Sequence, residues 1–356
     1  MKKILLKHVG NMGDLVFFTL PVLEILKRVY PDSHITFITA WGLKERRRSL
    51  LPPFKKYDFW GNRNFSGYCI SLLAANPQID ELVHWHDTAL SLTADICHEE
   101  GERYKTWNKA YYESQKESGM YDLVSELDMG VGHTENPLTR MYHAVGLPQE
   151  TYSNYKINLT PHDLLVAKEV TKSWPKPSII LIEGLAGKTT RGWDGAKVSH
   201  LETAITEKFG HKPIWFGGSN IPTYEGRQLT LRENIATLTY ADVAIGVLSG
   251  PLHFAAAVGL PTITLYADHP LHRAAPAYFL NQYISDEKKK HRTLLGPSRN
   301  SDQFLKHDNP SQNLTPQEIA VQGHESWLNP GKQSTKTPLA TLTVDEVMLV
   351  LQDIVR

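Results

Sequence analysis

The chain has few of the features that mark membrane or secreted proteins. It holds only two cysteines, Cys69 and Cys97, which lie far apart and in no metal-ligand spacing. This favours a reducing compartment over a disulfide scaffold. No run of about eighteen apolar residues occurs, so no membrane-spanning helix is expected. The basic start, Met1 to Leu6, is followed at once by Lys7 and His8 and lacks a signal-peptide core, so we expect a cytoplasmic protein, peripheral to a membrane at most.

An excess of positive charge is also missing, because 38 Lys and Arg residues balance 38 Asp and Glu residues. Bulk electrostatics therefore gives no attraction to nucleic acid, and any anion must be bound locally. One local exception runs from Lys44 to Lys56, where six basic residues accompany one acidic residue. Such a segment suits anionic lipid headgroups or a phosphorylated acceptor, and a solvated loop is the alternative. Its candidate acceptor-binding residues are Arg46, Arg47 and Lys55.

The N-terminal part has the pattern of a strand, a helix and a second strand. Strands are predicted from Ile4 to Val9 and from His34 to Thr39, with an amphipathic helix from Leu15 to Tyr30. The loop before the helix ends with Gly13 and Asp14, and in a right-handed βαβ unit it lies at the carboxyl edge of the sheet. Because Asp14 would repel a diphosphate, we expect it to be a general base, with a simple helix N-cap as the alternative.

A second sheet is predicted to begin at Ser178 to Ile182, after a proline-rich connection. The loop beyond this strand carries Lys188, Thr189 and Arg191 and resembles the end of a phosphate-binding P-loop. The first glycine of that motif would fall at Ile182, which argues against a P-loop NTPase. Lys188 and Arg191 are instead expected to neutralise a diphosphate leaving group.

The hexapeptide Ser249 to Phe254 lies between two buried-strand patterns, Ala244 to Val247 and Thr262 to Tyr266. It predicts a strand-to-helix turn whose free N–H groups form an anion site, with His253 as a further donor. An ordinary helix start with a buried histidine is the alternative. Gly217, after another predicted strand, permits close approach of a ligand, and Glu225 is a weaker candidate acceptor for ribose hydroxyls.

Five separate stretches together resemble glycosyltransferase family 9, the ADP-heptose-dependent heptosyltransferases of lipopolysaccharide assembly. They occur across nearly the whole chain in the order of the family, which is more specific than any one of them. The stretches are Lys3 to Asp14, Thr19 to Leu23, Tyr30-Pro31, Arg191 to Trp193 and Ser249 to His253.

The resemblance implies an α/β protein of the GT-B class, with two Rossmann-like, doubly wound domains facing across a cleft. The expected parts are residues 1–165 for the acceptor, residues 176–340 for the nucleotide sugar, and a terminal helix within 343–356. Transfer would be inverting and metal-independent, with Asp14 as the base, no cofactor and an ADP-sugar as co-substrate. The donor-binding set would comprise Gly13, Lys188, Thr189, Arg191, Gly217, Glu225, Ser249, Gly250, Pro251, Leu252 and His253.

The expected partners are a nucleotide-sugar donor and a glycan or glycolipid acceptor at the inner membrane; a protein or nucleic-acid acceptor stays open. The family usually has Asp before Ser/Thr-Gly, where this chain has Leu248, so a donor sugar other than heptose is also open. Two alternatives remain, a nucleotide-sugar epimerase or hydrolase and a non-catalytic nucleotide-sugar-binding protein. Leu248 favours the latter.

Overall fold

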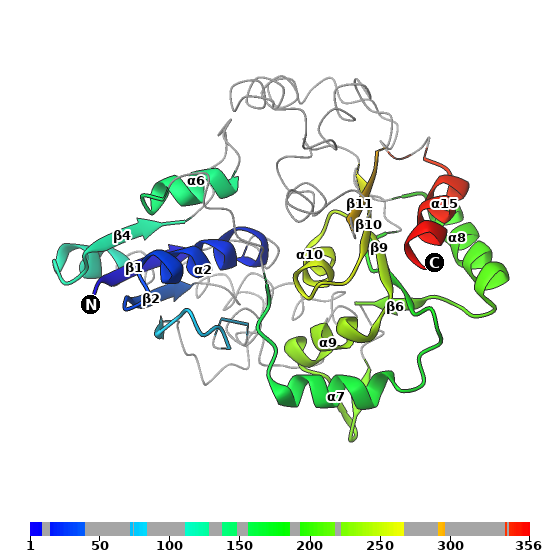
Figure 1. Ribbon diagram of the computed structural model, residues 1–356, viewed down its shortest axis with the longest axis horizontal. Coiled ribbons are helices and arrows are strands. Elements are labelled where there is room, and N and C mark those ends of the chain that lie inside the picture. The colour runs from blue at the N-terminus through cyan, green and yellow to red at the C-terminus, as the bar shows by residue number, and fades with distance from the viewer. Residues whose placement is uncertain are drawn as a thin grey trace, which may run out of the picture. The chain divides into compact units, whose positions relative to one another are not determined.

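The computed structural model describes residues 1–8, 15–39, 72–73, 75–83, 111–127, 137–147, 156–185, 193–217, 222–266, 291–295, 339 and 342–356. The chain divides into two compact units, each built on a parallel sheet (Figure 1). Unit 1 comprises Met1–Val131, Pro137–Val170 and Gly218–Ala236, and unit 2 comprises Gly132–Asn136, Thr171–Gly217 and Thr237–Arg356. The domain limits expected from the sequence stay a prediction.

Unit 1 contains a four-stranded sheet in the order β3-β2-β1-β4. The strands are β1 (Lys3–His8), β2 (His34–Thr39), β3 (Glu81–Val83) and β4 (Leu123–Glu126). All pairings are parallel, and β1 lies between β2 and β4. The βαβ unit expected at the N-terminus is therefore present, and the carboxyl end of β1 is at His8.

The helix after β1 differs from the regular helix predicted for Leu15 to Tyr30. It begins as a π-helix, η1 (Leu15–Thr19), and continues as the α-helix α2 (Leu20–Val29). Pro21 has no N–H to donate to the carbonyl four residues earlier, which explains why the regular α-helical ladder starts only at Leu20. The Thr19 hydroxyl is hydrogen-bonded to the ring of His8, and both side chains are buried.

The remaining described elements of unit 1 are two helices, a short hairpin and most of a third helix. They are α6 (Pro137–Ala144), α7 (Pro161–Thr171), the antiparallel pair β7 (Thr223–Tyr224) and β8 (Arg227–Gln228), and α9 (Leu231–Thr237). Residues 111–117 are also helical, and Tyr112 packs against Leu5 and Ile38 of the sheet.

Unit 2 contains a five-stranded parallel sheet in the order β11-β10-β9-β5-β6. Its strands are β5 (Ile179–Ile182), β6 (Ile214–Phe216), β9 (Val243–Val247), β10 (Thr262–Tyr266) and β11 (His291–Leu295). A short 3-10 helix, η4 (Leu238–Tyr240), precedes β9. The residues of β5 and β9 are fully or almost fully buried, as expected for strands inside a parallel sheet.

Helices cover both faces of this sheet. Figure 1 shows α8 (Gly195–Phe209) and α15 (Val344–Ile354) on one side of the strands and α10 (Gly250–Ala257) on the other. The main apolar core of unit 2 lies under α8 and α15 and includes Trp193. Both helices over this core are capped at their starts. For α8, Asp194 accepts from the N–H of Ala196 at 2.8 Å, and for α15, Thr343 forms a full capping box with Glu346.

The predicted fold class, an α/β protein with two parallel sheets, is confirmed by this topology. Among the described residues, no helix combines the length and apolar character needed to cross a membrane.

Candidate functional site

The carboxyl edge of the unit 2 sheet has the topology of a ligand site. From β5 the chain passes through α8 to β6 on one side, and it returns at β9 on the other side of β5. The helices that follow β5 and β9 lie on opposite faces of the sheet (Figure 1). Open α/β sheets bind ligands where the strand order reverses in this way, outside the carboxyl ends of the strands. Here that point is the edge shared by β5 and β9.

The turn from β9 into α10 places a free helix start at this edge. Ser249 is the N-cap residue and has extended backbone angles, φ −156° and ψ 163°. Its hydroxyl does not cap the helix, and this buried oxygen has no hydrogen-bond partner among the described residues. Pro251 lies in the first turn and brings no N–H. The dipole and amide groups of this helix start are thus available to an anion.

His253 lies one turn into α10, where its side chain is only 5% exposed. Burial lowers the pKa of His253 to about 3, so the imidazole is neutral at pH 7. It therefore offers a ring N–H or a lone pair, and no positive charge. The cations of a diphosphate site must come from other residues.

The predicted cations Lys188 and Arg191, together with Thr189, lie outside the described residues, but both ends of their loop are described. Trp193 donates its backbone N–H to the carbonyl of Leu185 at 2.7 Å, which closes the loop just beyond β5. The Trp193 indole is buried, and its Nε1 donates to the carbonyl of Leu342 at 3.3 Å. The loop thus starts and ends at fixed points near the carboxyl end of β5.

Two further residues complete the described part of this edge. Gly217 follows β6 directly, is buried and has φ 106°, a conformation that favours glycine. Glu183 follows β5 directly, and the sequence analysis did not select it. The sequence does contain a signal for Glu183, because a carboxylate directly after a buried strand is expected at the carboxyl edge of the sheet. The resemblance of the same stretch to a P-loop favoured Lys188 instead.

Glu225 belongs to unit 1. It occupies the turn between β7 and β8 at φ 51° and is exposed. Its expected role, accepting from ribose hydroxyls, stays a prediction. The negative charge of Glu225 raises the pKa of the neighbouring Tyr224.

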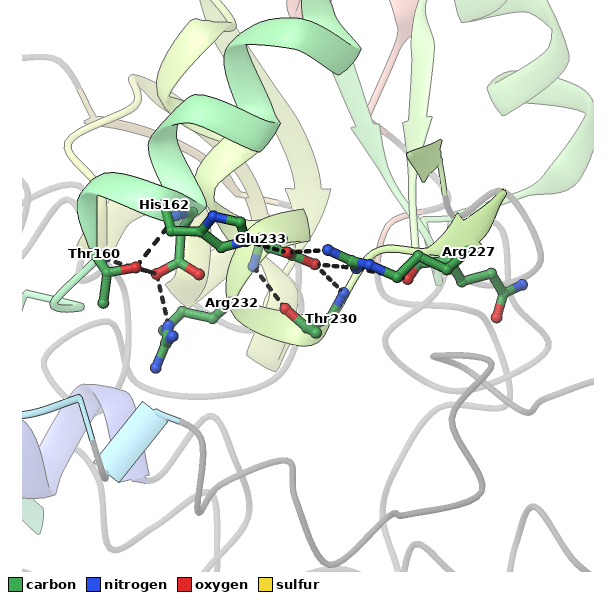
Figure 2. Close-up of polar contacts among 8 residues, drawn as sticks. Thr160, His162, Arg227, Thr230, Arg232 and Glu233 are labelled. Atoms are coloured by element: carbon green, nitrogen blue, oxygen red, sulfur yellow. Dashed lines mark hydrogen bonds and ion pairs between the residues drawn. The ribbon is translucent and has the colours of Figure 1, made fainter. Parts of the chain in front are cut away.

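Next to this hairpin, side chains of α7 and α9 form a dense polar cluster, which we call the clasp (Figure 2). Each helix is directly preceded by a threonine that is hydrogen-bonded to the acid three residues later, and an arginine donates to each of the two acids. Arg227 holds Glu233 through two hydrogen bonds of 2.7 and 2.6 Å, and Arg232 donates to Asp163 at 2.7 Å. The clasp comprises Thr160, His162, Asp163, Arg227, Thr230, Arg232 and Glu233.

The electrostatics of the clasp indicate a structural role. Burial of the Glu233 carboxyl opposes its ionisation, but hydrogen bonds from Arg227 and Thr230 outweigh burial and lower the pKa of Glu233 to about 2. His162 adds its Nε2 at 3.5 Å from the same carboxyl. Every charge named here has an opposite partner within the chain, so the clasp joins the starts of α7 and α9.

The remaining predicted site residues belong to the N-terminal part. Gly13 and Asp14 lie outside the described residues, as do the acceptor candidates Arg46, Arg47 and Lys55. The His8–Thr19 hydrogen bond joins the end of β1 to the end of η1, on either side of the segment that carries Asp14.

Comparison with known proteins bears on the chemistry of this edge. A sequence model described as Glycosyltransferase family 9 (heptosyltransferase) matches residues 227–297, which include β9, the Ser249 turn, α10 and β10. The resemblance to family 9 is thereby confirmed. The expected enzyme class, a glycosyltransferase, is supported by the same match. Comparison with curated protein sequences gives no significant match.

Solved structures with the same fold include family 9 proteins. A glycosyltransferase of family 9 from Veillonella parvula aligns over 99% of this chain and 97% of its own, with a TM-score of 0.58 and 14% identity. The Escherichia coli ADP-heptose LPS heptosyltransferase II aligns over 92% and 99%, with a TM-score of 0.51 and 13% identity. The iron-containing, dodecameric glycosyltransferase TibC of E. coli aligns over 99% and 79%, with a TM-score of 0.52 and 12% identity. At identities this low, the structural alignments show a shared fold and nothing finer.

Proposed function

We propose that the protein is an inverting glycosyltransferase that moves a sugar, heptose or a related one, from a nucleoside diphosphate to a hydroxyl of a cell-surface glycan or glycolipid. The observation that carries the proposal is the free start of α10 at the β5–β9 edge, inside the region that matches family 9. ADP-heptose is the donor we favour, because the name of the E. coli enzyme of the same fold includes it. The reaction would take place in the cytoplasm, at the inner membrane where the acceptor is lipid-linked.

The donor diphosphate would bind at the start of α10. The first-turn amides and the helix dipole stabilise negative charge there, and the Ser249 hydroxyl is free to donate. His253 would add a neutral N–H donor. Lys188 and Arg191 would supply the positive charge that stabilises ADP as it leaves.

In the chemical step, Asp14 would accept the proton of the acceptor hydroxyl. The acceptor oxygen forms a bond to the anomeric carbon as the bond from that carbon to the phosphate oxygen breaks. Attack from the face opposite the leaving group inverts the configuration at this carbon. The mechanism assigns no step to a metal ion.

The test incubates the full-length protein with ADP-heptose and a heptose-deficient lipopolysaccharide core, and follows both ADP and the glycosylated product. We expect Asp14→Ala to lower turnover at least about 100-fold, since a general base contributes about 10²- to 10⁴-fold, while ADP affinity stays within about threefold. Assays with a chelator should be unchanged.

Three results would contradict parts of the proposal. Full turnover by Asp14→Ala would show that Asp14 is not the general base. ADP release without an acceptor would indicate a hydrolase or epimerase. Failure to bind any of ADP, UDP and GDP in a calorimetric titration would favour the non-catalytic alternative.

A further inference from the structure

Glu183 is a carboxylate that the proposed mechanism does not use, although it stands at the centre of the site edge. Its backbone N–H donates to the carbonyl of Phe216 at 2.9 Å, so it continues the pairing of β5 with β6. The register of β5 places Ile182 beside Phe216, which puts Glu183 beside Gly217. On the other side, Leu181 pairs with Ile245 of β9, so Glu183 is level with the last residue of that strand.

The surroundings of Glu183 are poor in side chains. Gly217 beside it has none. Gly184, the next residue, also adopts a positive φ of 88°. Backbone without side chains allows a ligand to approach this edge closely.

Two polar side-chain atoms at this edge lack a hydrogen-bond partner in the described part of the chain. Among the described residues, no hydrogen bond reaches the buried Oε2 of Glu183, and none reaches the buried hydroxyl of Ser249. Burial raises the pKa of Glu183, because it removes water from the charged carboxylate. Buried polar atoms are normally paired, so two unpaired atoms at one sheet edge indicate groups that a ligand supplies.

From this geometry we infer that Glu183 accepts hydrogen bonds from hydroxyl groups of the donor, either on the ribose or on the transferred sugar. A carboxylate repels phosphate, so the diphosphate belongs at α10 and the neutral, hydroxyl-bearing part of the donor belongs at Glu183. Leu248, at the end of β9, has no polar side-chain atom with which to perform this task. Glu183 is thus a specificity-determining residue for the donor.

This inference rests on the proposed function, and one set of titrations separates the two. Calorimetry with the full chain compares wild type, Glu183→Gln and the control Glu207→Gln, an exposed carboxylate on α8 of the same unit. The ligands are ADP-heptose, ADP and 2′,3′-dideoxy-ADP, all in EDTA. Because a hydrogen bond to a charged group is lost, Glu183→Gln should bind the ligand that carries the contacted hydroxyls about 10- to 100-fold more weakly than wild type. The affinity of Glu207→Gln should equal that of wild type.

The ligand series identifies which hydroxyls are involved. Weaker binding of ADP-heptose alone assigns Glu183 to the transferred sugar, and weaker binding of ADP and ADP-heptose but not dideoxy-ADP assigns it to the ribose. Equal weakening of all three ligands, or no weakening of any, overturns the inference and leaves the proposed function intact. A wild-type affinity that requires Mg²⁺ would assign the carboxylate to a cation and also overturn it. If wild type binds none of the three ligands, the proposed function fails, and the inference fails with it.

A stability measurement distinguishes recognition from a structural role. Since partial burial disfavours the charged form of Glu183, Glu183→Gln should melt at the same temperature as wild type or higher without ligand, yet gain less from ADP-heptose. A lower melting temperature without ligand would show that the carboxylate serves the fold.

Discussion

Two carboxylates of this protein differ in whether the described residues donate hydrogen bonds to their buried oxygens. Glu233 in the clasp of unit 1 accepts hydrogen bonds at both oxygens, and its pKa is lowered to about 2. Glu183 at the sheet edge of unit 2 has a buried oxygen that accepts no hydrogen bond from the described residues, and its pKa is raised. The first is bound by the protein itself. The second is the carboxylate that we propose the donor binds, so the pair compares a structural cluster with a proposed binding site.

The helix starts show the same contrast. Thr343 and Asp194 cap α15 and α8 with their side chains, and Thr230 with Glu233 does so for α9. Ser249 has a suitable hydroxyl but does not cap α10. The amide groups at the start of α10 and the Ser249 hydroxyl are therefore available to the ligand that the proposed function places there.

The largest effect is expected from breaking the clasp. Glu233→Ala removes the partner of Arg227 and the capping interaction with Thr230. Because Arg227 is 45% exposed, water offsets part of the loss, and we expect the free energy of unfolding to fall by about 2–3 kcal/mol. Chemical denaturation measures it, with the exposed Glu225→Ala in the adjacent turn as the control. Equal stability of the two variants would show that the clasp is not structural.

Acid should weaken the clasp in a defined range of pH. The pKa of Glu233 is lowered in the folded state, so its contribution is complete above the unfolded value of 4.5 and is lost as pH falls toward about 2. With screening at the exposed Arg227, the loss is about 1–2 kcal/mol. Denaturation of wild type and Glu233→Gln between pH 6 and pH 2 should show the two curves converge. Parallel curves would disprove the assigned cause.

The contribution of Glu183 to stability should depend on pH in the opposite direction to that of Glu233. Because burial raises the pKa of this acid in the folded state, its ionisation costs stability as pH rises, and Glu183→Gln should be at least as stable as wild type at neutral pH. Thermal unfolding at neutral pH should show a melting temperature equal to that of wild type or higher. A loss of stability of the size expected for Glu233→Ala would remove the contrast between the two carboxylates.

The smallest effect is expected at the free helix start. Ser249→Ala removes no capping bond, so stability should change by less than about 0.5 kcal/mol, whereas Thr230→Ala should cost about 1 kcal/mol. The affinity of Ser249→Ala for ADP should fall about three- to tenfold. Calorimetry and denaturation of the two variants test both statements. The comparison fails if Ser249→Ala is the less stable of the two.

Local patterns in the sequence predicted much of the fold. The bounds of β2 and β10 were predicted to the residue, because Pro31 ends the helix before β2 and Pro261 directly precedes β10. The π-helix η1 was missed, since the apolar period of its residues does not distinguish it from an α-helix.

The site was predicted less completely. The turn at Ser249 was found because a strand, a glycine and a proline occur in fixed order there. The neutrality of His253 depends on burial, which the sequence does not give. The clasp joins Asp163 to Arg232, which lie 69 residues apart, and no local pattern connects them.

Hydrogen exchange of the backbone amides, with and without ADP-heptose, tests the central claim most directly. If the unsatisfied groups of unit 2 form the donor site, saturating ADP-heptose should slow exchange at residues 183–185 and in the first turns of α10, and should leave the clasp segments 160–164 and 230–234 unchanged. Protection limited to the clasp segments, or no protection at α10 despite measured binding, would contradict the account.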